Sequence, residues 1–348
     1  MKRVHGSWAS IDFDAKKQHL RKLFVGLSVF AVCGASANAQ LNIIPTFDPS
    51  IATNANAAAV ETAINSAITI IDGDISNPVT VTIDFGAITN GLGQSLTGQY
   101  LPTYSQYLNA LKTVQTLSAN DNIAIASLPA GPNNPVNGNT GVTATAPLLR
   151  ALGFNTPAAI PGISVTNFFD SDIQFNLALV NATRPGSNPN NYDLQATAEH
   201  EINEVLGIGG SGSVISTNSG ALTNAVGVLD LFRYSAPGVR SFTTSSNAVS
   251  FFSINGGTNK LVSFNQYGRG SDYSDWGDGV SPADGTGNNP QQVQDAFGTP
   301  GTNGVDEGVN ELTALDVVGW NVVVPEPSTV VLVVFGLLGA WSIRRRKA

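Results

Sequence analysis

The sequence predicts an α+β fold: a twisted mixed sheet, a long acidic helix and a Gly-rich, irregular C-terminal part. Three observations support this. Residues 41–85 follow a strand–helix–strand pattern, residues 193–206 contain good helix formers without Gly or Pro, and most of the later chain is rich in Gly and poor in strand-like runs. No period of 20 to 50 residues repeats, which disfavours a solenoid or a propeller.

The first unit is defined by changes in hydrophobic period. Residues 41–47 alternate as a short strand. Residues 55–71 are rich in Ala with apolar positions at helical spacing, and residues 79–85 alternate again with β-branched side chains. Period 2 indicates a half-buried strand and period 3.6 an amphipathic helix, so a βαβ-like unit is expected here.

The middle of the chain is less regular. Residues 86–160 are rich in Gly, Asn, Pro and Thr, and we expect one helix there, over 104–117. Whether this region covers the site, forms part of a cleft or is peripheral stays open. A strand is expected over 173–180, a helix over 193–206 that Gly207 ends, and a last helix over 310–318.

The N-terminus has the pattern of an export signal. Six Lys and Arg residues precede an apolar run from 23 to 35, and Ala37-Asn38-Ala39 follows. A basic segment, a short apolar core and small residues at the cleavage positions predict a secretory signal peptide over residues 1–39. A buried N-terminal helix is the alternative.

The C-terminus predicts a second targeting signal over residues 323–348. Pro325-Glu326-Pro327 precedes an apolar run over 329–343, and Arg344 to Lys347 are basic. The apolar run is expected to enter the membrane, with its basic end cytoplasmic. This tail resembles the PEP-CTERM sorting signal of Gram-negative bacteria. The resemblance implies an exosortase-type processing enzyme as partner, transient membrane anchoring, and then release to the cell surface or medium. A plain anchor is the alternative.

The body between these ends is strongly acidic. Residues 40–325 contain 7 Lys and Arg against 22 Asp and Glu, a net charge of −15. Nucleic-acid binding is disfavoured, because neutralising phosphates requires clustered basic residues. Contact with the membrane is expected only through the terminal segments. The only Cys, Cys33, lies outside the body, and His200 is its single histidine. A three-His zinc site is therefore excluded, and carboxylates must supply most ligands of any metal site.

The acidic helix contains the candidate metal ligands. His200 and Glu204 are four residues apart and therefore share one helical face, with Glu201 beside them. In zinc peptidases of the H-E-x-x-H type the end residues bind metal and the Glu takes a proton from the attacking water. Here a carboxylate replaces the second imidazole. A solvated helix face, with His200 paired to Glu204, is the alternative.

The segment His200 to Gly207 resembles the active-site helix of metzincin zinc peptidases. Residues 270–276 (GSDYSDW) resemble the segment that supplies the third zinc ligand in leishmanolysin-like members. Residues 294–297 (QDAF) and 311–320 (ELTALDVVGW) resemble their Met-turn region and closing helix. The pattern also resembles secreted PEP-CTERM proteins described as metallopeptidases. It implies a zincin-like domain over 40–322, with an upper part to residue 206 and a lower part from 207.

Carried over by position, the resemblance implies a metal site of His200, Glu204 and Asp275, with Glu201 as the general base. Glu204 and Asp275 stand where the family has histidines, and Phe297 stands where it has methionine. Zn²⁺ is the family's metal, but two carboxylates make Mn²⁺ or Ca²⁺ plausible as well. Arg233, Tyr234 and Phe297 could support the site, or Arg233 could neutralise a buried acid such as Asp230.

Two functions follow as expectations. The first is an exported metallopeptidase that hydrolyses a protein or peptide substrate through Glu201. The second is a zincin-like binding or extracellular-matrix (biofilm) protein without turnover. The substitutions at Glu204 and Asp275 favour the second, and the retained His200-Glu201 pair favours the first.

Overall fold

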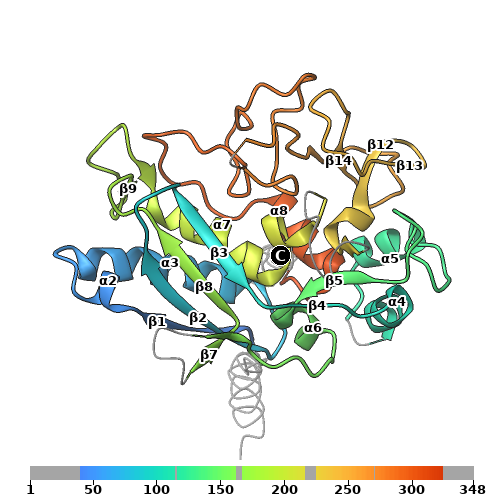
Figure 1. The fold of residues 1–348 in the computed structure, drawn as a ribbon, viewed down its shortest axis with the longest axis horizontal. Helices are drawn as coiled ribbons and strands as arrows, with labels where there is room; N and C mark the ends of the chain where they lie inside the picture. The colour runs from blue at the N-terminus through green and yellow to red at the C-terminus, as the bar shows by residue number, and fades with distance from the viewer. Residues whose placement is uncertain (1–39, 114–115, 162–166, 216–224, 270, 324–348) are drawn as a thin grey trace, which may run out of the picture. The chain divides into compact units, whose positions relative to one another are not determined.

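The structure, a computed structural model, describes residues 40–113, 116–161, 167–215, 225–269 and 271–323 (Figure 1). The predicted signal peptide and the apolar run 329–343 lie outside the described residues. Among the residues described, no helix is both long enough and apolar enough to cross a membrane.

A four-stranded mixed sheet forms one half of the body, in the order β1-β2-β8-β3. Its strands are β1 (Asn42–Phe47), β2 (Thr80–Ala87), β8 (Ser171–Phe175) and β3 (Gly93–Thr97). The first three run parallel, and β3 pairs antiparallel with β8 at the edge. Helix α3 (Ala57–Asp74) joins β1 to β2. The α+β class, the mixed sheet and the opening strand–helix–strand unit are confirmed.

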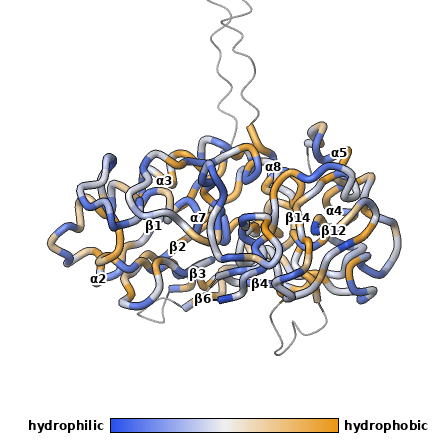
Figure 2. The backbone as a smooth tube through the Cα atoms, turned by 90° about the horizontal axis from the view of Figure 1, so that it is seen from above, coloured by the Kyte–Doolittle hydropathy of each residue, from blue (hydrophilic) through white to orange (hydrophobic). Residues whose placement is uncertain are grey.

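The apolar side chains of the sheet and of α3 form a shared core. Val81, Ile83 and Phe85 of β2 are fully buried, and so are Ile64 and Ala67 of α3. Each large apolar side chain buried in this way contributes about 1.5–3 kcal/mol to folding. Helix α7 (Leu194–Leu206) contacts both α3 and β3. Figure 2 shows α7 near the middle of the body, with α3 on one side and α8 (Val309–Val318) on the other.

Residues 99–151 form small elements beside the sheet. They comprise β4 (Gln99–Tyr100), β5 (Val142–Thr145), α4 (Tyr104–Thr113), α5 (Ala119–Ala126) and α6 (Ala146–Ala151). The single helix expected over 104–117 is therefore wrong in extent. A second helix begins after Ser118, because Ser118 and Asp121 form a capping box that starts α5.

The strand expected over 173–180 is also wrong in extent. It ends at Phe175, because Asn176 turns the chain and its side chain accepts a hydrogen bond from the backbone N–H of Ala178. The next strand, β9 (Val180–Asn181), pairs instead with β10 (Tyr192–Asp193). The apolar residues between β8 and β9 thus lie in a turn.

The chain after α7 is irregular, as expected. A small antiparallel sheet contains β12 (Arg233–Ala236), β13 (Val239–Arg240), β14 (Phe251–Phe252) and β15 (Val262–Ser263). The remaining short elements are α2 (Pro49–Ala52), β6 (Ile160–Pro161), β7 (Phe168–Phe169), η2 (Gly209–Gly212), β11 (Val226–Gly227) and η4 (Leu229–Phe232).

Helix α7 is fixed at both ends. The side chain of Asp193 accepts a hydrogen bond from the backbone N–H of Gln195 and caps the N-terminus. Gly207 ends the helix in the left-handed conformation, with φ 100°. The indole of Trp320 donates to the carbonyl of Leu206 at 2.8 Å. The predicted helix and its terminating glycine are confirmed, and the candidate site therefore lies on a rigid element.

Candidate metal centre

Three predicted ligands meet at one point of the structure. The Nε2 atom of His200 lies 3.8 Å from Oε1 of Glu204, one turn further along α7. The same nitrogen lies 3.7 Å from Oδ2 of Asp275, which a distant loop supplies. One nitrogen and two carboxylate oxygens from these residues lie within 4.8 Å of one another. The structure thus brings Asp275 to the two predicted ligands on α7.

The ring of His200 is held in one orientation. Its Nδ1 donates a hydrogen bond to the carbonyl of Val293 at 2.9 Å, so Nε2 is directed at the carboxylates. Burial acts to lower the pKa of His200. The charges of Asp275, Glu201 and Glu204 outweigh that effect and raise the pKa to about 9. The surrounding carboxylates thus favour a positive charge at this position.

The two carboxylate ligands are buried and positioned by other residues. Oε2 of Glu204 accepts a hydrogen bond from the hydroxyl of Ser95 on β3, and Oε1 accepts one from the backbone N–H of Gly210. Oδ1 of Asp275 accepts one from the side-chain amide of Gln294 at 2.9 Å. Burial raises the pKa of Glu204 and raises that of Asp275 well above its usual range.

Glu201 lies beside these ligands, and its side chain makes no hydrogen bond with the residues that the structure describes. The residue is 5% exposed. It packs so closely against β3 that a Cβ atom on Gly93 would lie 2.4 Å from its Oε1. Burial and the charge of Glu204 raise the pKa of Glu201 well above its usual range. A proton acceptor of raised pKa is therefore available next to the ligands.

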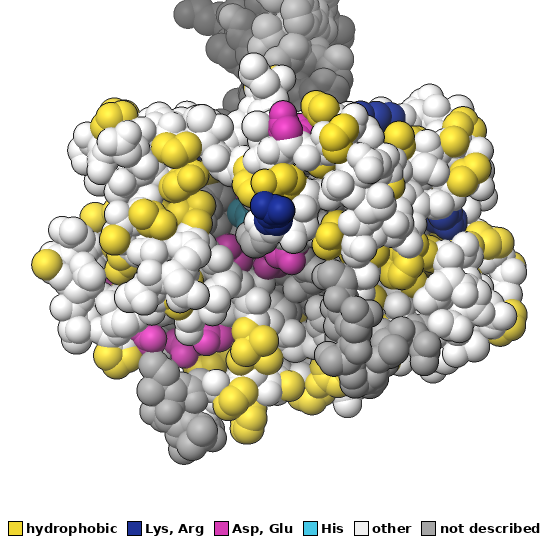
Figure 3. Space-filling view, turned by 45° about the horizontal axis from the view of Figure 1, so that its top comes forward, with side chains coloured by type: hydrophobic (Ala, Val, Ile, Leu, Met, Phe, Trp, Pro, Cys, Tyr) yellow, Lys and Arg dark blue, Asp and Glu magenta, His cyan; other side chains and the backbone are white. Residues whose placement is uncertain are grey.

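A cleft of about 270 Å³ opens over these side chains. Its walls come from β3 and the preceding loop, from α7, and from the segment 291–302. Figure 3 shows a histidine side chain in a hollow beside several carboxylates, and His200 is the only histidine among the described residues. Six acidic residues and no Lys or Arg line the cleft within the part of the chain that is described: Asp193, Glu201, Glu204, Asp272, Asp275 and Asp295.

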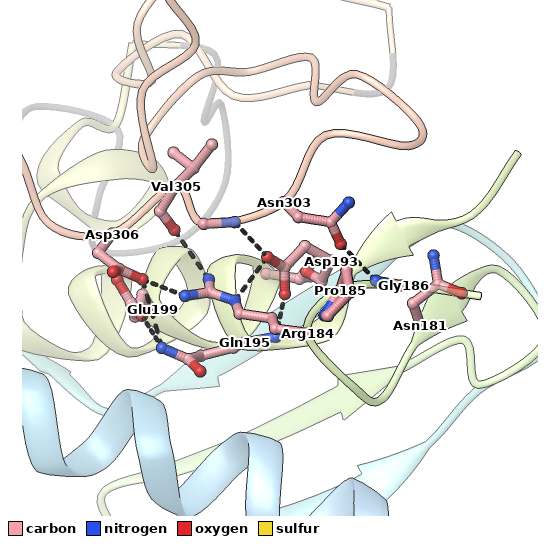
Figure 4. Close-up of polar contacts among 12 residues, drawn as sticks. Asn181, Arg184, Pro185, Gly186, Asp193, Gln195, Glu199, Asn303, Val305 and Asp306 are labelled. Carbon is pink, nitrogen blue, oxygen red and sulfur yellow. Dashed lines mark hydrogen bonds and ion pairs between the residues drawn. The ribbon is translucent and has the colours of Figure 1, made fainter. Parts of the chain in front are cut away.

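Arg184 ties the N-terminal end of α7 to one wall of the cleft (Figure 4). Its Nε lies 2.7 Å from Oδ2 of Asp193, the helix cap. The guanidinium also pairs with Asp306 and donates to the carbonyl of Val305 at 3.0 Å. Glu199 continues this network, because its carboxylate accepts a hydrogen bond from the backbone N–H of Glu307. These contacts link the cleft wall to the helix.

The predicted supporting residues lie behind the site rather than in it. Arg233 is fully buried, and its Nε donates to Oδ1 of Asp230 at 3.1 Å. Tyr234 is buried under Arg240, and Phe297 packs against Tyr267. Neither Arg233, Tyr234 nor Phe297 is among the described residues that line the cleft. The alternative in which Arg233 neutralises Asp230 is confirmed, and the guanidinium steadies the site loop by donating to the carbonyl of Tyr273.

Sequence reasoning missed two contributors to the site. Ser95 holds Glu204, and Gln294 contacts both His200 and Asp275. Gln294 stands in the segment compared with the Met-turn region, but its side-chain role had no signal in the sequence. Its Oε1 is buried and has no hydrogen-bond partner among the described residues. An orphaned acceptor beside one imidazole and two carboxylates fits a bound divalent cation.

Comparison with known families concerns the C-terminal tail. Residues 323–347 match the family described as the PEP-CTERM protein-sorting motif. The chain carries an exosortase sorting signal. This confirms the interpretation of Pro325-Glu326-Pro327 and the segment around it, and it implies export of the protein and processing at its C-terminus. No curated protein and no solved structure matches the chain.

Proposed function

We propose that this exported protein is a metal-dependent endopeptidase with a zincin-like fold. The observation that carries the proposal is the convergence of His200, Glu204 and Asp275 at the base of a cleft, with Glu201 beside them. The arrangement of α7 beneath an antiparallel edge strand supports the zincin-like comparison.

The donor set suits a divalent ion. One neutral imidazole and two carboxylates balance the +2 charge of the ion. Each ligand is also held by a hydrogen bond to another part of the protein, so less side-chain entropy is lost when the ion binds. Zn²⁺ accepts such ligands, whereas a carboxylate-rich set also suits Mn²⁺ and Ca²⁺. A bound ion would supply Lewis acidity to the scissile carbonyl and to the attacking water.

Glu201 would act as the general base. Its carboxylate faces the cleft without a hydrogen-bond partner in the described structure, so an oxygen is free to accept a proton from water. Burial raises its pKa well above the usual range, which makes it a stronger base than a solvated glutamate. After peptide cleavage the same oxygen would return the proton to the leaving amine.

A second candidate function is a zincin-like binding or matrix protein without turnover. Glu204 and Asp275, which stand where the family has histidines, favour it, because two carboxylate ligands lower the Lewis acidity of a bound divalent ion.

The deciding experiment is hydrolysis of casein by the purified protein in the presence of Zn²⁺, Mn²⁺ or Co²⁺. Wild type is expected to cleave with at least one ion and to lose activity in EDTA. The Glu201→Gln variant is expected to bind the same ion and to lose at least about 100-fold in rate, since general-base catalysis contributes 10²–10⁴-fold. Binding without cleavage would instead support the second function, and absence of both would contradict the metal site itself.

A further inference from the structure

Gln294 is built into the candidate centre. Its side chain is fully buried, and its Nε2 lies 2.9 Å from Oδ1 of Asp275 and 3.3 Å from Nε2 of His200. When the ring of His200 is neutral and Nδ1 carries the hydrogen donated to Val293, Nε2 can accept a hydrogen bond from the amide. The amide NH₂ group thus donates toward two of the three predicted ligands.

The other end of the same amide lacks a partner. Oε1 of Gln294 is buried and accepts no hydrogen bond from the described residues. A buried acceptor without a partner destabilises the folded state, because it has lost its hydrogen bond to water. The observed orientation therefore satisfies the amide nitrogen at the expense of the amide oxygen.

Hydrogen bonds hold the backbone of Gln294 in place, so a turn of its amide need not move the chain. Its backbone N–H donates to Oε1 of Glu311, and its carbonyl accepts from the backbone N–H of Trp276 at 2.8 Å. Trp276 itself is fully buried and donates to the same Glu311 oxygen. Rotation of the terminal amide by about 180° exchanges oxygen and nitrogen without moving the chain.

Space for this amide depends on a glycine. A Cβ atom on Gly209 would lie 2.1 Å from Nε2 of Gln294 and 3.0 Å from Oδ1 of Asp275. Gly209 also has φ 57°, a conformation that side chains other than glycine rarely adopt. The loop after α7 therefore leaves room for the amide next to the ligands.

We propose that Gln294 is the fourth protein ligand of the metal centre, turning its Oε1 toward a cation held by His200, Glu204 and Asp275. This inference rests on the metal site of the proposed function. A cation bound between Nε2 of His200 and the two carboxylates favours the opposite orientation of the amide, because the NH₂ group would otherwise face a charge of its own sign. The turn makes the cation the partner of the amide oxygen and moves the NH₂ group to the position that the oxygen held.

The added ligand determines the class of ion. With an amide oxygen the donor set has three oxygens and one nitrogen, and carbonyl and carboxylate oxygens suit Mn²⁺ and Ca²⁺ better than they suit Zn²⁺. Removal of Gln294 should therefore weaken Mn²⁺ binding more than Zn²⁺ binding.

The test is calorimetric titration of the purified protein with Mn²⁺ and with Zn²⁺. The Gln294→Leu variant is expected to bind Mn²⁺ at least about tenfold more weakly than wild type, with a smaller loss for Zn²⁺. The Gln294→Glu variant keeps an oxygen in place and adds charge, so it should bind Mn²⁺ at least as tightly as wild type. Circular dichroism melts in EDTA would establish that both variants fold.

The Gln291→Leu variant is the matched control, because Gln291 lines the same cleft and is not a predicted ligand. Its Mn²⁺ affinity should equal that of wild type. If Gln294→Leu binds Mn²⁺ as tightly as wild type, or more tightly, the ligand role of Gln294 is wrong while the metal site stands. If wild type binds neither ion, both the inference and the proposed function fail.

Discussion

Asp275 supplies charge to the candidate centre from outside α7. The residue is 3% exposed, and its carboxylate lies 3.7 Å from the ring of His200 and accepts a hydrogen bond from the amide of Gln294. Burial of a carboxylate is costly unless a cation or hydrogen bonds compensate it. Because Arg233 interacts more closely with Asp230, a bound cation is the compensation we expect for Asp275.

Replacement of Asp275 by Asn keeps the shape and the acceptor for Gln294 but removes the charge. We expect the Asp275→Asn variant to fold and to bind divalent ions about 10- to 100-fold more weakly, as measured by calorimetry. Asp295→Asn is the control, since Asp295 lines the same cleft but is held by Asn288 and Gln292. Equal losses in both variants would contradict a specific role for Asp275.

The residues of the site were predictable to different degrees. His200, Glu201 and Glu204 follow from helical spacing alone, because i and i+4 side chains share a face. Asp275 stands among other acidic residues of a Gly-rich loop, so only the family resemblance distinguished it. Gln294 was missed because its side chain reaches His200 and Asp275 only through the backbone pairing of Trp276 with Phe264 and with Asp295. No local sequence pattern encodes this pairing.

Helix α7 determines where the site lies. Arg184 and Asp193 fix its first turn, and Gly207 and Trp320 fix its last. Gly207 adopts a left-handed conformation against the side chain of Leu148, to which an added Cβ would approach within 2.9 Å. Termination of the helix and its packing thus depend on the same residue.

The Gly207→Ala substitution is expected to lower the free energy of unfolding by about 2–4 kcal/mol, from backbone strain and overpacking together. Gly238→Ala is the matched control, because Gly238 has φ 73° but nothing within 4 Å of an added Cβ. Its free energy of unfolding should fall only by the cost of the backbone strain, about 1–2 kcal/mol. Urea denaturation measures both, and equal losses would show that packing at Gly207 is unimportant.

Helices and strands were predicted well where a clear hydrophobic period extends over several consecutive residues. Helices α3, α7 and α8 and strands β1 and β2 lie within a few residues of expectation. Strand β3 was missed because its sequence, Gly-Gln-Ser-Leu-Thr, lacks a clear apolar face, and its position at the edge depends on pairing with β8. Two-residue strands such as β14 exist only through long-range pairing, which a local pattern cannot show.

At the scale of the whole molecule, buried acids dominate the electrostatics. Burial raises the pKa of Asp72, Asp84 and Asp316 to about 6 and that of Glu199 to about 8. In the unfolded chain these groups ionise near pH 4. The contribution of each group to the stability of the native state is therefore fully present below about pH 4. The contribution of the three aspartates is lost as the pH rises through about 6, and that of Glu199 as it rises through about 8.

The metal-free protein should consequently be more stable at pH 5 than at pH 8. We expect the free energy of unfolding in EDTA to fall by about 1–3 kcal/mol over this range, because partial exposure of several groups reduces their effect. His200, with its pKa raised to about 9, adds to the same trend as the pH rises further. Urea denaturation at several pH values tests this, and a flat or rising profile would contradict it. Glu199→Gln should reduce the slope.

The sorting signal and the candidate metal centre lie in separate parts of the chain. The sorting signal over residues 323–347 is recognised from its own sequence, whereas the candidate centre depends on contacts between α7 and loops far along the chain. The body's net charge of −15 also creates a long-range negative potential that attracts cations to this centre. This potential arises because acidic residues outnumber basic ones in the body by 22 to 7.

The most direct test is anomalous X-ray scattering from crystals of the protein grown with Mn²⁺. The account predicts one strong peak in the cleft, about 2.0–2.4 Å from Nε2 of His200 and from carboxylate oxygens of Glu204 and Asp275. Absence of a peak there at saturating Mn²⁺, or a peak elsewhere with these side chains unchanged, would contradict it.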